Sequence, residues 1–211
     1  HNKGKGVMIG KLDSIEPRVV TVIGAGVAGT QSISKALDNH ALVNVLDTSQ
    51  SKLQQLESEF GSSNIEYILS TTDSVQSAIN ESDMVIGSVY VVGKDAPKVV
   101  SRDMLKSMNP GTVMVDVSID QGGCFESSRP TTHDNPTFLE NDIVHYCVTN
   151  MPGAVPLTAT QALNKVTLSY IEDLANKGVE NALNDDEHLR NGLNIQNGEI
   201  THPAVKDALN N

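Results

Sequence analysis

The stretch Val19-Val-Thr-Val-Ile-Gly-Ala-Gly-Val-Ala-Gly-Thr30 decides the fold that the sequence predicts. An apolar run typical of a buried strand leads into Gly24-x-Gly26-x-x-Gly29, and a helical pattern begins inside this motif. The first glycine permits a tight turn, the second lets the backbone approach a pyrophosphate, and the third lets the helix pack closely on the strand. We therefore predict a dinucleotide site with the phosphates at the helix N-terminus. The alternative is a glycine-rich turn that serves packing alone.

A second apolar run, residues 42–46, ends in Asp47, close to the ~20 residues beyond the motif at which an acidic side chain binds the ribose diol. Thr48 and Ser49 follow it, and no arginine is adjacent. Because the Asp47 carboxylate would repel a 2′-phosphate, the sequence predicts NAD as the cofactor rather than NADP.

Composition argues against several other classes of protein. The net charge of −11 argues against nucleic acid as a partner, because neutralising phosphates requires a basic surface. No apolar run approaches the ~20 residues of a membrane helix, so we expect no membrane span. Cys124 and Cys147 have neither the spacing of a zinc site nor that of a disulfide framework. We expect no metal, and reduced thiols in a cytoplasmic protein.

Hydrophobic patterns divide the chain into three parts. We expect residues 1–17 to be a connecting segment, residues 18–156 to be an NAD-binding domain of the α/β class, and residues 157–211 to be a C-terminal helical segment. Alternating strand and helix patterns in the middle part predict a Rossmann-type, doubly wound parallel sheet. Its strands are expected at residues 19–23, 42–46, 65–69, 84–89, 112–119 and 143–148, and helices at residues 50–60, 73–80, 98–107 and 157–177. Residues 127–142 are expected to form a polar loop.

Three loops follow strand ends at the edge of the sheet where ligands bind. They are Ser88–Gly93, Asp120–Gly123 and Asn150-Met151. Asp120 is the main candidate for chemistry, because it places a carboxylate beside a Gly-Gly turn where a nicotinamide would lie. The alternative is that Asp120 only caps a turn. Ser70 follows the third strand, where it is either a hydrogen-bond partner for the adenine side or an ordinary strand-end serine.

His133 and His145 are the histidines considered as a general acid or base. A histidine without an identified partner is more often structural than catalytic. We therefore favour a structural or surface role for both.

Several blocks of the sequence resemble the bacterial alanine dehydrogenases. They are Val117-Ser-Ile-Asp-Gln-Gly-Gly-Cys-Phe-Glu126, Arg129–His133 and His145–Pro156, with Gly87–Val89 and Ala96–Val100 fitting as well. The resemblance covers nearly the whole chain, and these blocks are more specific than the glycine motif. The nicotinamide nucleotide transhydrogenases share the fold, but the run from Asp120 to Glu126 is more similar to the dehydrogenases.

This resemblance implies an enzyme that oxidises L-alanine to pyruvate and ammonium, with hydride transfer to NAD. It implies that the adenosine and phosphates are bound by Gly24, Ala25, Gly26, Val27, Ala28, Gly29, Asp47, Lys52 and Ser70. It further implies that Val89, Asn150 and Met151 line the nicotinamide end. Asp120 would lie beside the reacting carbon and assist the acid–base histidine.

In the family, the arginine and lysine that bind substrate and the catalytic histidine lie in an N-terminal third that has no counterpart in this sequence. We therefore expect residues 157–211 to complete a substrate domain, and the chain to bind NAD(H) without being active alone. The family forms homohexamers, and the apolar face from Ala159 to Leu174 predicts self-association. The alternatives are a transhydrogenase domain and a module that senses NAD(H) without chemistry, which would have no use for Asp120.

Overall fold

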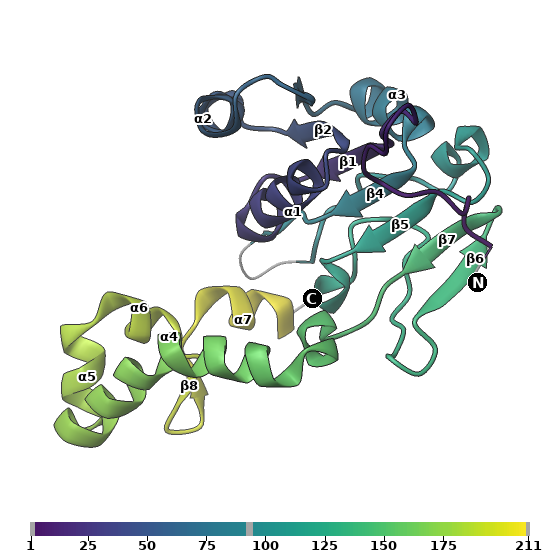
Figure 1. Ribbon diagram of the computed structural model, residues 1–211. Coiled ribbons are helices and arrows are strands. Elements are labelled where there is room, and N and C mark those ends of the chain that lie inside the picture. The colour runs from purple at the N-terminus through teal and green to yellow at the C-terminus, as the bar shows by residue number, and fades with distance from the viewer. Residues whose placement is uncertain (1–2, 92–94, 210–211) are drawn as a thin grey trace. The chain divides into compact units, whose positions relative to one another are not determined.

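The computed structural model describes residues 3–91 and 95–209 (Figure 1). These residues form two compact units, one of residues 3–91 with 95–150 and one of residues 151–209. The first unit contains a large sheet with helices, and the second is mainly helical.

The first unit is built on a seven-stranded sheet with the order β3-β2-β1-β4-β5-β7-β6. All neighbours are parallel except β6 and β7. The strands are β1 (Val19–Ile23), β2 (Leu42–Asp47), β3 (Ile65–Leu69), β4 (Met84–Gly87), β5 (Val113–Asp116), β6 (Thr137–Glu140) and β7 (Ile143–Tyr146). The strand order reverses between β1 and β4, which is where open α/β sheets bind ligands. The predicted Rossmann-type fold is confirmed.

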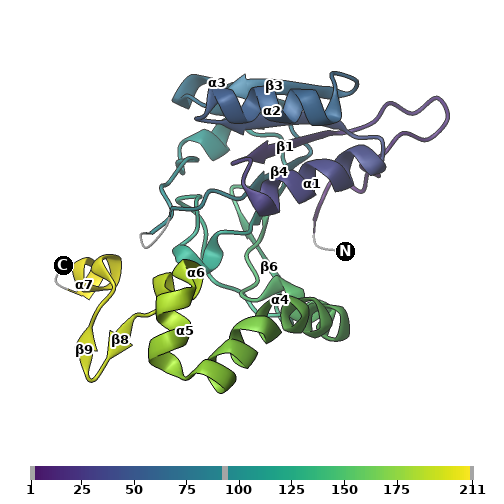
Figure 2. The ribbon, with the colours of Figure 1, turned by 90° about the vertical axis from the view of Figure 1, so that its left-hand side faces the viewer.

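Helices cover both faces of this sheet, because strand side chains alternate between the two faces. Val20 and Val22 of β1 pack with α1 (Val27–Asp38) and α2 (Gln50–Phe60) on one face. Ile23 packs with α3 (Thr72–Glu81) on the other. Figure 2 shows α1 and α2 in front of the strands. Each face of the sheet therefore has its own apolar core.

The starts of α2 and α3 are set by hydroxyl side chains. Ser49 accepts a hydrogen bond from the Lys52 amide, and Thr71 forms a reciprocal capping box with Ser74. Gly61 follows the last residue of α2 with a φ of 74°. The predicted helix at residues 50–60 is therefore confirmed to the residue.

The helix predicted for residues 98–107 is wrong. This segment contains one short 3₁₀ turn, η1 (Met104–Ser107). The preceding residues run extended beside residues 121–126, where the Val99 amide donates to the Cys124 carbonyl at 2.8 Å. Pairing with a distant part of the chain therefore replaces the intrahelical hydrogen bonds of this segment.

Several strand boundaries differ from the prediction, and β7 ends at Tyr146 rather than at residue 148. Strands β4 and β5 end at Gly87 and Asp116, rather than at residues 89 and 119. After β5 the chain leaves the ladder because Asp116 accepts from the Ser118 amide at 3.0 Å, which bends the backbone away from the sheet. The polar loop predicted for residues 127–142 contains the antiparallel strand β6, which is joined to β7 by Asn141 and Asp142.

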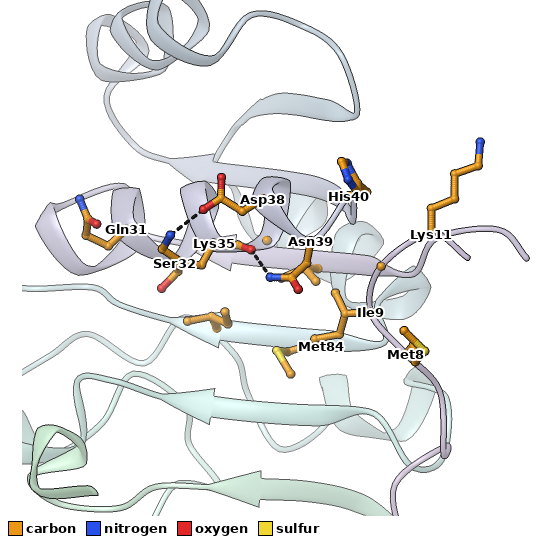
Figure 3. Close-up of a pocket in the computed structure, with 14 residues that line it drawn as sticks. Met8, Ile9, Lys11, Gln31, Ser32, Lys35, Asp38, Asn39, His40 and Met84 are labelled. Carbon is orange, nitrogen blue, oxygen red and sulfur yellow. Dashed lines mark hydrogen bonds and ion pairs between the residues drawn. The ribbon is translucent and has the colours of Figure 1, made fainter. Parts of the chain in front are cut away.

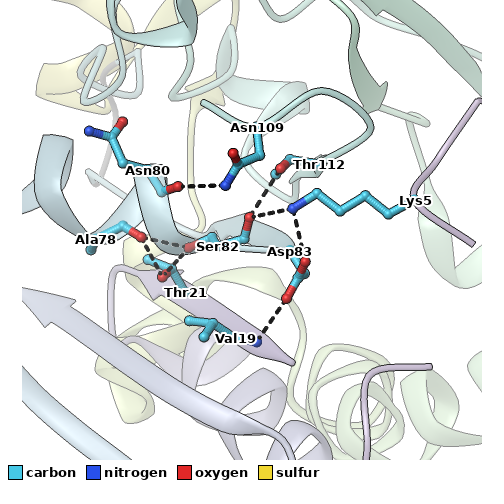
Figure 4. A network of polar contacts seen from close by, with 9 residues as sticks. All are labelled: Lys5, Val19, Thr21, Ala78, Asn80, Ser82, Asp83, Asn109 and Thr112. Atoms are coloured by element: carbon cyan, nitrogen blue, oxygen red, sulfur yellow. Dashed lines mark hydrogen bonds and ion pairs between the residues drawn. The ribbon is translucent and has the colours of Figure 1, made fainter. Parts of the chain in front are cut away.

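The N-terminal segment is fastened to the sheet by Lys5 (Figure 4). The Lys5 ammonium donates to the Asp83 carboxylate at 2.8 Å and to the Ser82 carbonyl at 3.2 Å. The second Asp83 oxygen accepts from the Val19 amide, where β1 begins. One carboxylate thus connects this segment to the start of the central strand.

The second unit begins with η3 (Met151–Ala154) and the 22-residue helix α4 (Pro156–Lys177). Beyond it lie α5 (Val179–Asp185), α6 (Glu187–Asn191), the hairpin of β8 (Ile195–Gln196) and β9 (Glu199–Ile200), and α7 (Pro203–Leu209). Of the residues described in this unit, Ala182 is the one hydrophobic residue that is fully buried. Across both described ranges, every helix is too short or too polar to cross a bilayer.

Candidate functional site

The three glycines after β1 have different environments. Gly24 has a φ of +92°, and a Cβ there would lie 2.7 Å from the Ser88 carbonyl oxygen. A Cβ on Gly29 would lie 1.9 Å from the Gly24 oxygen. A Cβ on Gly26 would meet nothing within 4 Å, and the φ of Gly26 is an ordinary −68°. Packing and turn geometry explain Gly24 and Gly29 but not Gly26, whose open backbone fits the close approach of a ligand.

The N-terminus of α1 is open to a ligand. No side chain caps this helix, and the Thr30 amide, 2.9 Å from the Gly26 oxygen, makes its first internal hydrogen bond. The earlier amides of a helix have no internal partner, and its dipole favours negative charge at this end. Val27, in the first turn, is 87% exposed. This arrangement fits a pyrophosphate.

Asp47 ends β2 beside the glycine turn. One of its carboxylate oxygens accepts from the Ala25 amide and the other from the Ser49 amide, each at 2.8 Å. Each oxygen keeps lone pairs, so a ribose diol has acceptors available. The Ser70 amide donates to the Asp47 carbonyl at 2.9 Å, and Lys52 lies in the first turn of α2. The structure therefore brings together four residues that were predicted at the adenosine and phosphate site, namely Ala25, Asp47, Lys52 and Ser70.

Ala25 differs from its neighbours in the motif. Its side chain is buried, and its amide is already bonded to Asp47. Ala25 therefore has no free amide for a phosphate and supports the turn instead.

A cavity of about 520 Å³ lies where the loops after β1, β4 and β5 meet. It is lined by Gly26, Val27, Ala28, Ser88, Tyr90, Val117, Ser118, Asp120 and Gln121. The exposed side chain of Asp120 is the one charged group among these lining residues. The Gln121 Oε1 atom is buried without a hydrogen-bond partner in the described part of the chain. Such an atom fits a site completed by a ligand.

Sequence reasoning identified Asp120, the glycine-loop residues and the loops that contain Ser88, Tyr90 and Gln121, but it did not single out Val117 and Ser118. Ser88 directly follows β4, and Ser118 lies two residues after β5. Both serines brace the loops, because Ser88 donates to the Gly24 carbonyl and Ser118 to the Val89 carbonyl, each at 2.7 Å. Position shortly after a strand end, the signal that placed the loop starting at Ser88, could also have found Ser118.

The remaining residues predicted at the nicotinamide end do not line this cavity. Val89 packs against the core, and Asn150 adopts a left-handed conformation with its carbonyl accepting from the His133 ring at 3.0 Å. Met151 belongs to the second unit. Residues 92 and 93 of the predicted loop lie outside the described residues, as do residues 1–2 and 210–211 of the terminal segments.

Asp116, which sequence analysis did not single out, organises the loop that contains Asp120. Its buried carboxylate accepts from the amides of Ser118, Cys124 and Phe125 and from the Ser128 hydroxyl. Burial, together with the nearby Asp116 charge, raises the pKa of the Cys124 thiol well above its usual value. Cys124 therefore stays protonated and is no nucleophile.

His145 is structural, as favoured from the sequence. Its Nδ1 donates to the Ile143 carbonyl at 3.1 Å, so Nε2 accepts from the Ser127 hydroxyl at 2.7 Å. The ring is buried and stacks on Phe138 at a centroid distance of 4.8 Å. Burial lowers the pKa of His145, which keeps the ring neutral.

A larger cavity, of about 790 Å³, lies at the other end of α1 (Figure 3). It is lined by Met8, Ile9, Gly10, Lys11, Val20, Gln31, Ser32, Lys35, Ala36, Asp38, Asn39, His40, Met84 and Ile86. Because the C-terminal end of a helix repels anions, this cavity does not suit a phosphate. The residues described in the structure contain no cluster of three metal-ligating side chains.

Comparisons with known proteins agree with this geometry. The family model described as "Alanine dehydrogenase/PNT, C-terminal domain" matches residues 1–203. An alanine dehydrogenase of Halomonas elongata is 47% identical over 205 residues, which is 97% of this chain and 55% of the relative. One of Staphylococcus saprophyticus is 44% identical over 98% of this chain and 56% of its own length. The chain thus spans about half the length of the curated relatives it matches.

Among solved structures, an alanine dehydrogenase is also more similar to this chain than a transhydrogenase is. An L-alanine dehydrogenase superposes with a TM-score of 0.89 at 42% identity, covering 99% of this chain and 57% of that one. A transhydrogenase from Sinorhizobium meliloti superposes with a TM-score of 0.71 at 26% identity, covering 90% and 51%. Both similarities extend over the sheet and the helical unit that follows it.

Proposed function

This chain belongs to the alanine dehydrogenase/PNT C-terminal domain family, and from that membership we propose that it is the NAD-binding part of an alanine dehydrogenase. The complete enzyme would convert L-alanine reversibly to pyruvate and ammonium. The higher identity to the dehydrogenases, 42% against 26% for the transhydrogenase structure, supports this choice over a transhydrogenase domain.

The main observation in support of NAD binding is the open space beside the Gly26 backbone. The first amides of α1 would donate to the pyrophosphate, and the Gly26 backbone would let it approach. Asp47 would accept the hydroxyls of the adenosine ribose while its charge disfavours a 2′-phosphate. Lys52 and Ser70 would complete the adenosine side. Val27 and Ala28 would bound the path from the phosphates to the cavity.

The cavity beyond the glycine turn is the place proposed for the nicotinamide. Bound NAD supplies the hydride acceptor for the substrate Cα. Asp120 would face that reacting centre, which supports an enzyme over a sensor without chemistry. Ser88 and Ser118 hold the two adjoining loops in place. Val89 and Asn150 are proposed to contribute to the same end.

Substrate recognition requires groups that this cavity does not supply. A substrate carboxylate needs a cationic partner, and none of the described residues that line the cavity is cationic. We propose that the remainder of a longer protein, comparable to the half of the relatives that this chain does not match, supplies these groups and the acid–base histidine. We also propose a cytoplasmic homo-oligomer, a hexamer as in the family.

The test of this proposal is fluorescence titration of the chain and of Gly26→Ala with NADH. Since the new Cβ meets no protein atom, the variant should keep its melting temperature. It should nevertheless lose about tenfold or more in NADH affinity, because the methyl group occupies the space of the pyrophosphate. Equal affinities would reject this site.

A further inference from the structure

We propose that Lys98 is a positioning residue that holds Asp120 at the cavity by clamping the Gly122-Gly123 turn. This inference rests on the proposed function, because it concerns the nicotinamide end of the same site. Lys98 does not line the cavity.

The Lys98 ammonium donates to two consecutive carbonyls, those of Gly122 at 2.5 Å and Gly123 at 2.6 Å. Lys98 lies on the extended segment beside this turn. The Ala96 amide donates to the Gln121 carbonyl at 2.9 Å, and that of Val99 to Cys124 at 2.8 Å. Lys98 thus reaches the turn between two backbone hydrogen bonds. Within the described ranges, it forms no ion pair that would compete for its charge.

The turn is held from both sides by opposite charges. Gly122 and Gly123 both have left-handed φ values, +83° and +75°. Asp116 accepts the amides that precede and follow them, those of Ser118 and Cys124. The Lys98 ammonium, by contrast, donates to the carbonyls of the two glycines themselves. Charged donors make stronger hydrogen bonds than neutral ones, so Lys98 restrains the two glycines of the loop.

Asp120 depends on this restraint because its own side chain makes no hydrogen bond within the described structure. It lies in η2 (Ile119–Gln121), directly before the clamped glycines. The adenosine side is fixed separately, by Asp47 and the turn after β1. Loss of the Lys98 clamp should therefore disturb the nicotinamide end and leave the adenosine end intact.

The experiment compares NADH with ADP-ribose, which lacks the nicotinamide, as ligands of the 211-residue chain. Lys98→Met should weaken NADH binding about tenfold, a loss typical of a charged hydrogen bond, while ADP-ribose affinity stays unchanged. Lys98→Arg should restore the wild-type ratio, because a guanidinium can donate to two carbonyls. Lys106→Met is the matched control, since Lys106 is an exposed lysine paired with Asp103.

A merely structural Lys98 would shift both affinities together, and that result, or no shift in either, would overturn the inference. If Lys98→Met does not fold, Lys98→Gln is titrated in its place with the same expected change in ratio. A wild-type chain that binds neither ligand would reject the proposed function itself, and this inference with it. Wild-type binding with an unchanged ratio in the variant would reject the role of Lys98 alone.

Discussion

At the scale of single residues, the Asp47 carboxylate accepts from the Ala25 amide in the turn after β1 and from the Ser49 amide at the start of α2. The same carboxylate is the proposed acceptor for the ribose hydroxyls. Asp47→Ala should weaken NADH binding by roughly 1–3 kcal/mol, the worth of a charged hydrogen bond, and should reduce the preference for NADH over NADPH. Parallel titrations with both cofactors measure the two effects. Asp47→Asn keeps one acceptor oxygen, so its NADH affinity and cofactor preference should lie between those of the wild type and of Asp47→Ala. An unchanged cofactor preference would place the ribose elsewhere.

His145 should make the stability of the fold depend on pH. Burial lowers its pKa in the folded protein below the ordinary value of about 6.5, so the unfolded chain binds the proton first as the pH falls. The free energy of unfolding should therefore decrease from about pH 6.5 downward, until the pH reaches the pKa of the folded state. Urea unfolding of the wild type and of His145→Gln between pH 8 and pH 5 measures this. An equally steep decline in the variant would assign the effect to other groups.

Residues whose role depends on local spacing could be predicted from the sequence. Gly26 and Asp47 belong to a pattern of fixed offsets, so their place beside each other follows from the strand, turn and helix alone. Asp116 and Lys98 could not be predicted, because their partners are set by how distant segments pack. Lys98 is bonded to carbonyls 24 and 25 positions away, and nothing near it in the sequence indicates that contact.

At the scale of elements, the hairpin of β6 and β7 was not predicted, because the sequence signal for its turn is only two residues long. Its two turn residues, Asn141 and Asp142, both have positive φ, of 50° and 59°. Two such residues favour the type I′ turn that joins antiparallel strands. The prolines and polar residues before them predicted a loop instead. Lys98–Ser107 is the converse case, in which a helical pattern was overridden by pairing with residues 121–126.

This turn yields a stability prediction. Asp142→Gly should raise the free energy of unfolding by about 0.5–1 kcal/mol, because glycine adopts positive φ without the steric cost of a side chain. Asn141→Val should lower it, since β-branched residues are strained in that conformation. Denaturant melts of both variants measure the changes. A destabilised glycine variant would show that the Asp142 side chain has an independent role.

Helix α4 presents apolar side chains to solvent in the described structure. Leu157, Leu163, Val166 and Ile171 are 72%, 61%, 62% and 58% exposed. Exposed apolar side chains of this kind favour association, so the chain should self-associate with rising concentration. Sedimentation velocity should show a shift to larger species that Leu163→Glu with Val166→Glu abolishes, without a change in NADH affinity. A monomer at every concentration would reject this role for α4.

At the scale of the whole molecule, the chain should bind cofactor but not deaminate alanine at a useful rate. Hydride transfer requires the substrate Cα held against the nicotinamide, and such positioning is worth roughly 7–11 kcal/mol of barrier. A general base adds about 10²–10⁴-fold. Among the described residues that line the cavity, Asp120 is the one charged group, and it offers no cation for the substrate carboxylate.

The assay is alanine-dependent NADH formation at alkaline pH, first with this chain and then with the other half of a related alanine dehydrogenase added as a separate polypeptide. The chain alone should show no turnover, whereas reconstitution should restore it, because the added half would supply the carboxylate-binding and acid–base groups. Asp120→Asn in the reconstituted enzyme should lower kcat while leaving ADP-ribose affinity within about threefold, since the adenosine contacts persist. Turnover by the chain alone would show that the catalytic groups are misplaced here, and His133, which is exposed and bonded to Asn150, would be the next candidate.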